Sequence, residues 1–233
     1  MKNFAIIAAA GSGERLRHSH SKMLIPISGK PLLSYTLAKF EESNKIDEIV
    51  LVVRAQDLGK IEQEILKKND YRKIKNVIIG GPTRQESVYC GLMAIKEEDG
   101  VVCIHDGARP LIQKWMIDKP IEMVNNYDGV ILAIPAVNTI KRVILEEMLV
   151  ESTVDRSKFW MVQTPQVFRL RKIKEYYKRA KRDKIKATDD STILECYGGK
   201  VGILRGSEEN IKVTSQTDLL LTEILLNRYN FGK

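Results

Sequence analysis

Short apolar runs rich in β-branched residues alternate with helix-like stretches along most of this chain, and this alternation restricts its fold more than any other feature. Phe4–Ala10 and Ile49–Val53 are two such runs. Thr83-Arg84-Gln85-Glu86 opens a helix-like stretch with a capping-box pattern that runs to Ile95. Repeated strand–helix alternation favours an α/β fold: a mostly parallel sheet with helices on both faces. Further strands are expected at 77–79, 101–105, 130–134 and 201–204, and further helices at 31–40, 58–67, 115–126, from 170, at 190–195 and after 218.

The alternation stops once, between residues 139 and 154. Thr139–Leu145 and Leu149–Val154 each alternate polar and apolar residues, and Glu146-Glu147 lies between them as a turn. This pattern predicts a β-hairpin arm at about 137–157 that protrudes from a single domain spanning residues 1–233. Because an isolated two-stranded hairpin is marginally stable in water, we expect the arm to pack on a second subunit in a homodimer.

Composition excludes several classes of protein. No stretch approaches the roughly 20 apolar residues that span a bilayer, and the short N-terminal apolar run lacks the pattern of a signal peptide. We therefore expect a cytoplasmic protein without membrane contact. The three cysteines (Cys90, Cys103 and Cys196) and the three histidines are scattered, so neither a zinc site nor a disulfide framework is predicted.

The formal net charge is +8, and much of the excess lies between Arg169 and Lys186. There the cations recur around Ile173, Tyr176 and Tyr177, as on the solvated face of an amphipathic helix. The alternative is a basic module that binds nucleic acid. We expect the helix face, and no nucleic acid partner.

Glycines follow the first predicted strand, in Ala8-Ala9-Ala10-Gly11-Ser12-Gly13-Glu14-Arg15-Leu16. Glycines at this position allow backbone N–H groups to approach a phosphate closely, and the loop falls at the sheet edge where ligands bind in doubly wound folds. Leu16 replaces the third glycine of a dinucleotide fingerprint, which disfavours a dehydrogenase. Arg17 replaces the lysine of a G-x-x-x-x-G-K phosphate loop. Nearby Arg15 and Lys22 supply positive charge, so the loop predicts a phosphate site.

Four further segments place charged residues near the same predicted edge. They are Gly80–Val88, His105-Asp106-Gly107-Ala108-Arg109-Pro110, the pair Thr153–Arg156 and Gln163–Gln166, and Glu209–Thr214. With the glycine loop, they resemble the 2-C-methyl-D-erythritol 4-phosphate cytidylyltransferase family, in the same order from Ile6 to Thr214. The strings that carry the resemblance are Gly-Ala-Arg-Pro, Asn-Thr-Ile-Lys-Arg-Val, Val-Asp-Arg, Thr-Pro-Gln and Asn-Ile-Lys-Val-Thr.

The resemblance implies a Rossmann-like fold of the nucleotidyltransferase type and a role for each matched residue. CMP would pass from CTP to the polyol phosphate, with release of pyrophosphate, in isoprenoid precursor synthesis. The implied catalytic residues are Arg15, Lys22 and Lys212. The implied CTP-binding residues are Ala8, Ala9, Ala10, Gly11, Ser12, Gly13, Gly81, Ser87 and Asp106. The implied polyol-phosphate-binding residues are Arg109, Arg156, Thr164, Thr188 and Lys212, with Arg156 supplied by the partner subunit through the arm.

The implied cofactor is Mg²⁺ or another divalent cation, held mainly by the CTP phosphates with Asp106 as a protein ligand. A phosphate monoester is largely dianionic near pH 7, so the acceptor needs no general base. Catalysis is therefore expected to rest on positioning and charge stabilisation. The nearest alternative is a ribitol 5-phosphate cytidylyltransferase, whose relatives share the glycine loop and Thr-Pro-Gln but look less similar around Arg84–Ser87 and Thr139–Arg142.

Overall fold

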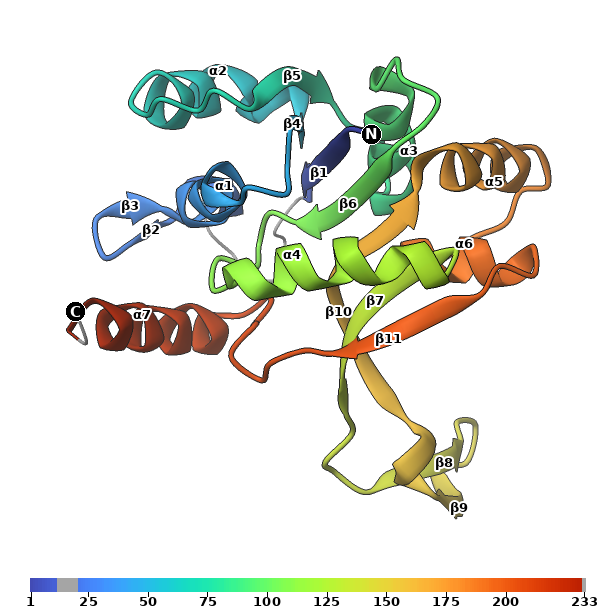
Figure 1. Cartoon of the computed structure of the whole chain (residues 1–233). Helices are drawn as coiled ribbons and strands as arrows, with labels where there is room; N and C mark the ends of the chain where they lie inside the picture. The colour runs from blue at the N-terminus through green and yellow to red at the C-terminus, as the bar shows by residue number, and fades with distance from the viewer. Residues whose placement is uncertain (12–20, 232–233) are drawn as a thin grey trace.

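The computed structural model describes residues 1–11 and 21–231, and its centre is a seven-stranded sheet (Figure 1). The strand order is β11-β7-β10-β6-β1-β4-β5, and every neighbouring pair is parallel except the two that β10 makes with β6 and β7. The mostly parallel sheet predicted from the sequence is confirmed. Its strands are β1 (Asn3–Ala9), β4 (Glu48–Val53), β5 (Ile74–Ile79), β6 (Val101–Asp106), β7 (Gly129–Pro135), β10 (Trp160–Arg169) and β11 (Val201–Arg205).

Helices cover both faces of the sheet, because successive side chains of each strand point to opposite sides. Ile7 of β1 lies in a core with α1, α2 and α4, whereas Ile6 lies in a second core with α3, α5 and α6. The α-helices are α1 (Leu32–Glu42), α2 (Leu58–Ile61), α3 (Arg84–Ala94), α4 (Lys114–Met123), α5 (Leu170–Arg182), α6 (Asp190–Cys196) and α7 (Gln216–Phe231). Shorter helical turns are η2 (Lys22–Leu24), η3 (Ala55–Asp57), η4 (Glu62–Leu66), η5 (Val124–Asn126) and η6 (Arg156–Lys158).

Strand β10 is the one strand of the main sheet that the sequence analysis leaves unassigned. Proline removes a ladder hydrogen bond, and Pro165 in the middle of this segment argues against a central strand. The structure accommodates it with a register shift between Gln163 and Gln166 opposite β7. This irregular stretch lies beside the end of β6 and delivers Thr164 to the site described below.

A small hairpin that the sequence analysis did not predict anchors the C-terminal helix. Strands β2 (Pro26–Ile27) and β3 (Lys30–Pro31) pair across Ser28 and Gly29, whose φ angles are 46° and 80°. Both turn residues thus adopt the left-handed conformation that two-residue hairpins require. The backbone N–H of Ser28 donates to Glu223 of α7 at 3.1 Å.

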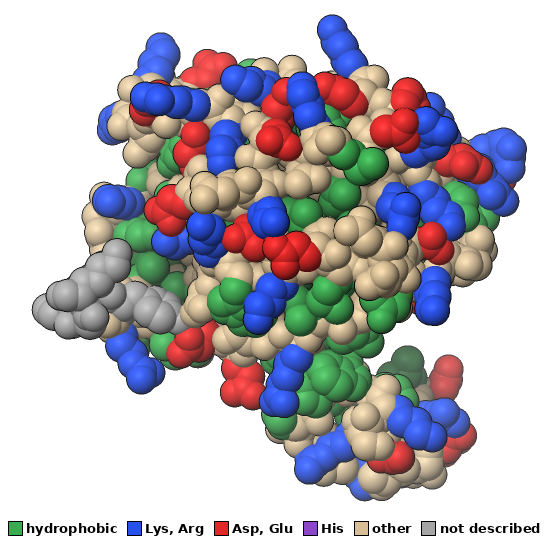
Figure 2. Space-filling view, viewed as in Figure 1, with side chains coloured by type: hydrophobic (Ala, Val, Ile, Leu, Met, Phe, Trp, Pro, Cys, Tyr) green, Lys and Arg blue, Asp and Glu red, His purple; other side chains and the backbone are tan. Residues whose placement is uncertain are grey.

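The arm forms a separate two-stranded sheet of β8 (Ile140–Ile144) and β9 (Leu149–Val154). It projects beyond the ends of β7 and β10 (Figure 1). Apolar side chains are exposed along the arm and its stem, where Figure 2 shows them grouped. They include Val143, Ile144, Leu145, Met148, Leu149, Val150, Phe159, Trp160 and Met161. Exposed apolar patches of this kind commonly mark a surface that contacts another protein.

The carboxyl ends of β1, β4, β5 and β6 meet at one edge of the sheet. Strands β6 and β7 are both antiparallel to β10, which lies between them, so β7 runs parallel to β6. The carboxyl end of β7, from which the arm leaves, therefore lies at the same edge. Among the described residues, no helix has both the length and the apolar character needed to span a membrane.

Candidate active site

Two cavities open side by side at this edge of the sheet. The first has a volume of about 630 Å³ and is lined by residues that follow β1, β4, β5 and β6. The second has a volume of about 420 Å³ and lies against β10 and the start of α6. Three charged residues line both cavities: Arg84, Asp106 and Lys212. Ligands in the two cavities would therefore meet across one cluster of charges.

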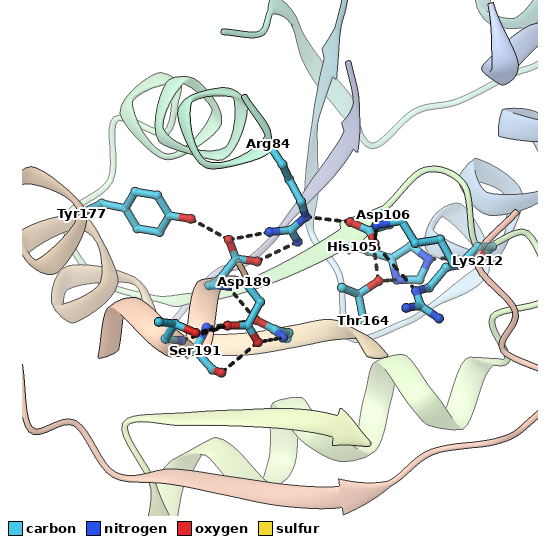
Figure 3. A network of polar contacts seen from close by, with 12 residues as sticks. Arg84, His105, Asp106, Thr164, Tyr177, Asp189, Ser191 and Lys212 are labelled. Atoms are coloured by element: carbon cyan, nitrogen blue, oxygen red, sulfur yellow. Dashed lines mark hydrogen bonds and ion pairs between the residues drawn. The ribbon is translucent and has the colours of Figure 1, made fainter. Parts of the chain in front are cut away.

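Asp106, the last residue of β6, lies at the centre of this cluster (Figure 3). Its Oδ1 accepts from Arg84 Nε at 2.8 Å, and its Oδ2 lies 2.8 Å from Lys212 Nζ and 3.7 Å from Arg109 Nε. Burial alone would raise the pKa of Asp106, but the attraction of Arg84, Lys212 and Arg109 outweighs it. The pKa of Asp106 lies well below its usual value, and the side chain is a carboxylate at neutral pH.

Arg84, the first residue of α3, bridges Asp106 to a second carboxylate (Figure 3). Its Nη1 and Nη2 donate to the two oxygens of Asp190 at 3.0 Å and 2.8 Å. Burial opposes its charge, but Asp190 and Asp106 raise the pKa of Arg84 above its usual value. Of the five N–H groups of a guanidinium, three are thus used on carboxylates.

His105 and Thr164 fix the backbone beneath Asp106. The Thr164 hydroxyl lies 3.1 Å from His105 Nδ1 and accepts from the backbone N–H of Asp106 at 3.0 Å. His105 Nε2 lies 3.3 Å from the Arg109 carbonyl oxygen. Burial lowers the pKa of His105 to about 3, so the ring is neutral at pH 7. Its contacts suit structural support of the backbone beneath Asp106.

Arg109 is a buried cation at the wall of the second cavity. Its Nη1 donates to the Asn210 carbonyl oxygen at 2.6 Å, while its Nε has no hydrogen-bond partner in the structure as described. Burial lowers the pKa of Arg109 despite the attraction of Asp106. An anion that enters the second cavity would therefore meet the positive charge of Arg109 at its wall.

Glycines let the chain approach closely at the wall of the first cavity. A Cβ on Gly80 would lie 2.6 Å from Ser87 Oγ, and one on Gly81 would lie 2.5 Å from Glu86 Cβ. The Ser87 hydroxyl donates within this turn, at 3.1 Å from the Gly81 carbonyl oxygen. The capping box of Thr83 and Glu86, predicted from the sequence, is present and begins α3 here. The turn and the helix start are therefore held as one unit.

Most of the predicted site residues lie in these two cavities. Those that line the first are Ala8, Ala10, Gly11, Lys22, Gly81, Ser87, Asp106 and Lys212. Those that line the second are Asp106, Arg109, Thr164, Thr188 and Lys212. Ala9 is fully buried and lines neither cavity. Ser12, Gly13 and Arg15 lie outside the described residues.

Arg156 lies apart from both cavities. It belongs to η6 at the base of the arm, where Nη1 donates to the Val137 carbonyl oxygen, and it lines neither cavity of its own chain. This position leaves open the prediction that Arg156 acts on the site of a partner subunit.

Arg84, Asp190 and Arg54 have no role predicted from the sequence. Arg84 stands in the segment Gly80–Val88, directly after a predicted strand, which is a usable signal. Arg54 follows β4 and lines the first cavity, with Nε at 2.6 Å from Asp57 Oδ2. No local signal could have found Asp190, since it lies 106 residues from Arg84.

The described residues contain no group of three His, Cys, Asp or Glu side chains that could hold a metal ion. Asp106 is the carboxylate that lines both cavities. Mg²⁺ in proteins often takes one or two carboxylates together with substrate phosphates and water. The donor set thus fits a metal ion held mainly by a bound nucleotide, and does not fit a metal ion held by the protein alone.

A mostly parallel α/β sheet with a cationic pair of cavities beyond its carboxyl ends defines a protein of the doubly wound, nucleotide-binding class. The family model described as IspD, 2-C-methyl-D-erythritol 4-phosphate cytidylyltransferase, matches residues 3–228. The chain therefore belongs to this family of cytidylyltransferases, as the resemblance predicted.

Individual relatives agree with the family match. A 2-C-methyl-D-erythritol 4-phosphate cytidylyltransferase of Clostridium acetobutylicum is 42% identical over 226 residues, covering 97% of this chain and 98% of that protein. One of Alkaliphilus metalliredigens is 42% identical over 228 residues, covering 98% and 94%. The crystal structure of 4-diphosphocytidyl-2C-methyl-D-erythritol synthase from Anaerococcus prevotii has a TM-score of 0.85 at 33% identity, covering 97% of this chain and 96% of that one.

Proposed function

We propose that this protein transfers CMP from CTP to 2-C-methyl-D-erythritol 4-phosphate, giving 4-diphosphocytidyl-2-C-methyl-D-erythritol and pyrophosphate for isoprenoid precursor synthesis. The observation that carries the proposal is the shared wall of the two cavities, in which Arg84, Asp106 and Lys212 face both. The reaction joins two polyanions. A site for it needs two adjoining spaces with cations where they meet, and the family match supplies the identity of the substrates.

CTP would occupy the first cavity, with its base and ribose against the Gly80–Gly81 turn and Ser87. Gly80 and Gly81 leave no space for a Cβ, so backbone groups would form the wall that selects the small pyrimidine. Lys22 and Lys212 would contact the triphosphate, joined by Arg15 from the glycine loop. The acceptor phosphate would lie in the second cavity beside Arg109, Thr164 and Thr188.

In the reaction, a phosphate oxygen of the acceptor attacks the α-phosphorus of CTP. The new phosphorus–oxygen bond forms as the bond between the α-phosphorus and the bridging oxygen breaks, and pyrophosphate leaves with that electron pair. The acceptor dianion carries no proton that must be removed. Lys212 would stabilise charge on the α-phosphate, and Lys22 would stabilise charge on the leaving group, so catalysis would rest on preorganised electrostatics.

Mg²⁺ is proposed as the cofactor, held by the phosphate oxygens of CTP and by Asp106. It would neutralise part of the triphosphate charge. Asp106 already accepts from Arg84 and Lys212, but a carboxylate has about four lone-pair sites, so the remaining sites would be available to the ion. The Lys212 side chain is 38% exposed, so it would contact the α-phosphate while it remains beside Asp106.

A pyrophosphate-release assay with CTP and Mg²⁺ tests the function and the acceptor together. Release with 2-C-methyl-D-erythritol 4-phosphate and none with ribitol 5-phosphate is the expected result. Release with ribitol 5-phosphate alone would keep the two-cavity mechanism and reject the proposed acceptor. No release with either acceptor would reject the function.

A homodimer that forms through the arm is the second part of the proposal. It is supported by the exposed apolar residues of the arm and by the position of Arg156 outside both cavities of its own chain. Mixing Arg156→Ala and Lys212→Ala chains tests it. If Arg156 acts on the partner's site, each mixed dimer regains one complete site, and a random mixture recovers about a quarter of wild-type activity. No recovery would place Arg156 in its own chain's site.

The remaining expectations concern location and other partners. A cytoplasmic location is proposed because both substrates are small phosphorylated metabolites. The basic segment predicted as a helix is α5, and several of its cations are engaged with carboxylates of this chain: Lys172 with Asp128 at 2.7 Å, and Arg171 with Asp99 at 2.7 Å. Figure 2 shows basic and acidic side chains interspersed on the face in view. These pairings support a solvated helix face over a surface for nucleic acid.

A further inference from the structure

Behind the shared wall of the two cavities lies a buried group that the proposed reaction does not use. Asp190 is fully buried at the start of α6, and Tyr177 of α5 donates its hydroxyl hydrogen to Asp190 Oδ1 at 2.5 Å. Neither Asp190 nor Tyr177 lines a cavity of the site. They touch Arg84, which does, through the paired contacts of Arg84 with Asp190.

A buried carboxylate is costly unless it is paired and fully hydrogen-bonded. Asp190 meets that cost with the two hydrogen bonds from the Arg84 fork and the one from the Tyr177 hydroxyl. Replacing a buried ion pair by apolar residues of similar volume is often neutral or stabilising. The chain thus keeps a charged group where stability alone does not require one, and its contacts run toward the reacting centre.

We propose that Asp190, held by Tyr177, is a positioning residue that sets the Arg84 guanidinium and, through it, the placement of Asp106 and Lys212. The inference rests on the proposed function, in which Lys212 stabilises the α-phosphate. Arg84 uses both Nη groups on Asp190, so it presents only Nε to Asp106 Oδ1. Asp106 Oδ2 is left for Lys212.

Loss of the Asp190 charge has a specific consequence. An arginine and a carboxylate prefer two parallel hydrogen bonds. Once released from Asp190, Arg84 would bind both oxygens of Asp106 and displace Lys212 from Oδ2. The catalytic lysine would then be present but misplaced, and misplacement of about 1 Å can cost up to about a hundredfold in rate.

Two variants with matched controls test the proposal by steady-state kinetics. Asp190→Asn removes the charge, and Asp128→Asn is its control, because Asp128 also pairs with a cation but lies away from both cavities. Tyr177→Phe removes only a hydroxyl. Its control is Tyr197→Phe, which removes the hydrogen bond from Tyr197 to Asp183 at 2.8 Å.

We expect kcat to fall about tenfold or more in Asp190→Asn and about three- to tenfold in Tyr177→Phe, with the KM for CTP within about twofold of wild type. Both controls should retain wild-type kcat. Thermal unfolding checks that each variant is folded, and Tyr177→Phe keeps the test valid if Asp190→Asn does not fold. A purely structural role would lower the active fraction and the unfolding midpoint together and would leave the kcat per folded site unchanged.

A double-mutant cycle separates positioning from general damage. If Asp190 acts through Lys212, Asp190→Asn should lower kcat by less than about twofold on a Lys212→Ala background. Arg84→Lys keeps the charge at this position but lacks the fork, so its kcat should stay below that of the wild type. A full tenfold effect of Asp190→Asn on the Lys212→Ala background, or wild-type kcat in Tyr177→Phe and Asp190→Asn, would overturn the proposal.

Failure of the proposed function gives a different result from failure of this inference. If the wild type releases no pyrophosphate with either acceptor, the function is rejected, and the crystal structure of Asp190→Asn then decides the inference alone. Lys212 displaced from Asp106 Oδ2 by Arg84 would support it. Lys212 retained at Oδ2 would overturn it.

Discussion

The site at the sheet edge and the β8–β9 arm both carry charged and apolar residues, but they are completed in different ways. At the site, Asp106 and Asp190 are buried and each is paired with a cation of the same chain. In the arm, the apolar side chains are exposed, and the ion pair between Arg142 and Glu151 lies at the surface at 3.7 Å. One region is preorganised by contacts within its own chain, and the other leaves apolar side chains exposed.

This difference separates two kinds of functional contribution. Groups that must meet developing charge are held in place by buried contacts, so they need little reorganisation when the transition state forms. Groups that serve assembly stay accessible until a partner arrives. Substitutions at the site should therefore change turnover with little change in assembly. Substitutions in the arm should change assembly, and should change turnover only as a consequence.

The largest expected effect is on turnover in Lys212→Ala. Loss of this preorganised cation should lower kcat on the order of a hundredfold or more, with the dimer unchanged, as measured by pyrophosphate release and light scattering. Lys60→Ala, on the exposed surface of α2, is the control. Near-normal turnover in a folded Lys212→Ala enzyme would remove Lys212 from the mechanism.

The second effect concerns the arm. A carboxylate at Val150, which is 60% exposed, would be desolvated in an interface, so Val150→Asp should shift the dimer toward monomer and lower activity about tenfold. Far-UV circular dichroism should be unchanged, because the main sheet does not depend on the arm. Leu220→Asp, at an exposed apolar position of α7, is the control. Equal dissociation by Leu220→Asp, or a Val150→Asp dimer of wild-type stability, would contradict the arm as the interface.

Much of this comparison could be predicted from the sequence, because the relevant signals are local. The capping box at Thr83 and the paired Asp106 and Arg109 lie within four residues, so their spacing indicates contact. The arm was predicted because its period changes from that of the surrounding chain. These features could be predicted because each depends on the hydrophobic period or on residues within a single turn.

The parts that could not be predicted depend on contacts distant in sequence. Strand β10 contains Pro165, and only its position between β6 and β7 makes it a strand. The bridge from Arg84 to Asp190 joins two helix starts that the sheet brings together. Each of these residues alone has an ordinary surface explanation, and the fold is what buries them.

The third prediction concerns stability against pH at the site. The pKa of His105 is about 3 in the folded protein and about 6.5 in an unfolded chain. Between these values the unfolded state binds a proton that the folded state does not, so stability falls as the pH falls. From pH 7 to pH 5 the loss from this residue is about 2 kcal/mol.

Chemical denaturation of wild type and His105→Gln at pH 7 and pH 5 measures this contribution. Other groups titrate in both proteins, so the difference between their pH dependences isolates His105. The wild type should lose about 2 kcal/mol more than the variant over this range. Equal losses would mean that His105 is accessible to protonation in the folded protein, contrary to its burial beneath Asp106.

The smallest expected effect is the change in unfolding free energy when one helix cap is removed, either at the site or at the arm. Thr83 Oγ1 accepts from the Glu86 backbone N–H at 3.1 Å at the start of α3, which carries Arg84. Asp155 Oδ1 accepts from the Ser157 N–H at 3.1 Å at the start of the three-residue η6. Removing the first cap weakens a helix packed into the core, so Thr83→Ala should cost about 1 kcal/mol of unfolding free energy. Asp155→Ala should cost less than about 0.5 kcal/mol, since its turn is exposed. Equal losses in denaturant titrations would show that the arm unfolds as one cooperative unit with the sheet, and the two regions would then differ in exposure alone.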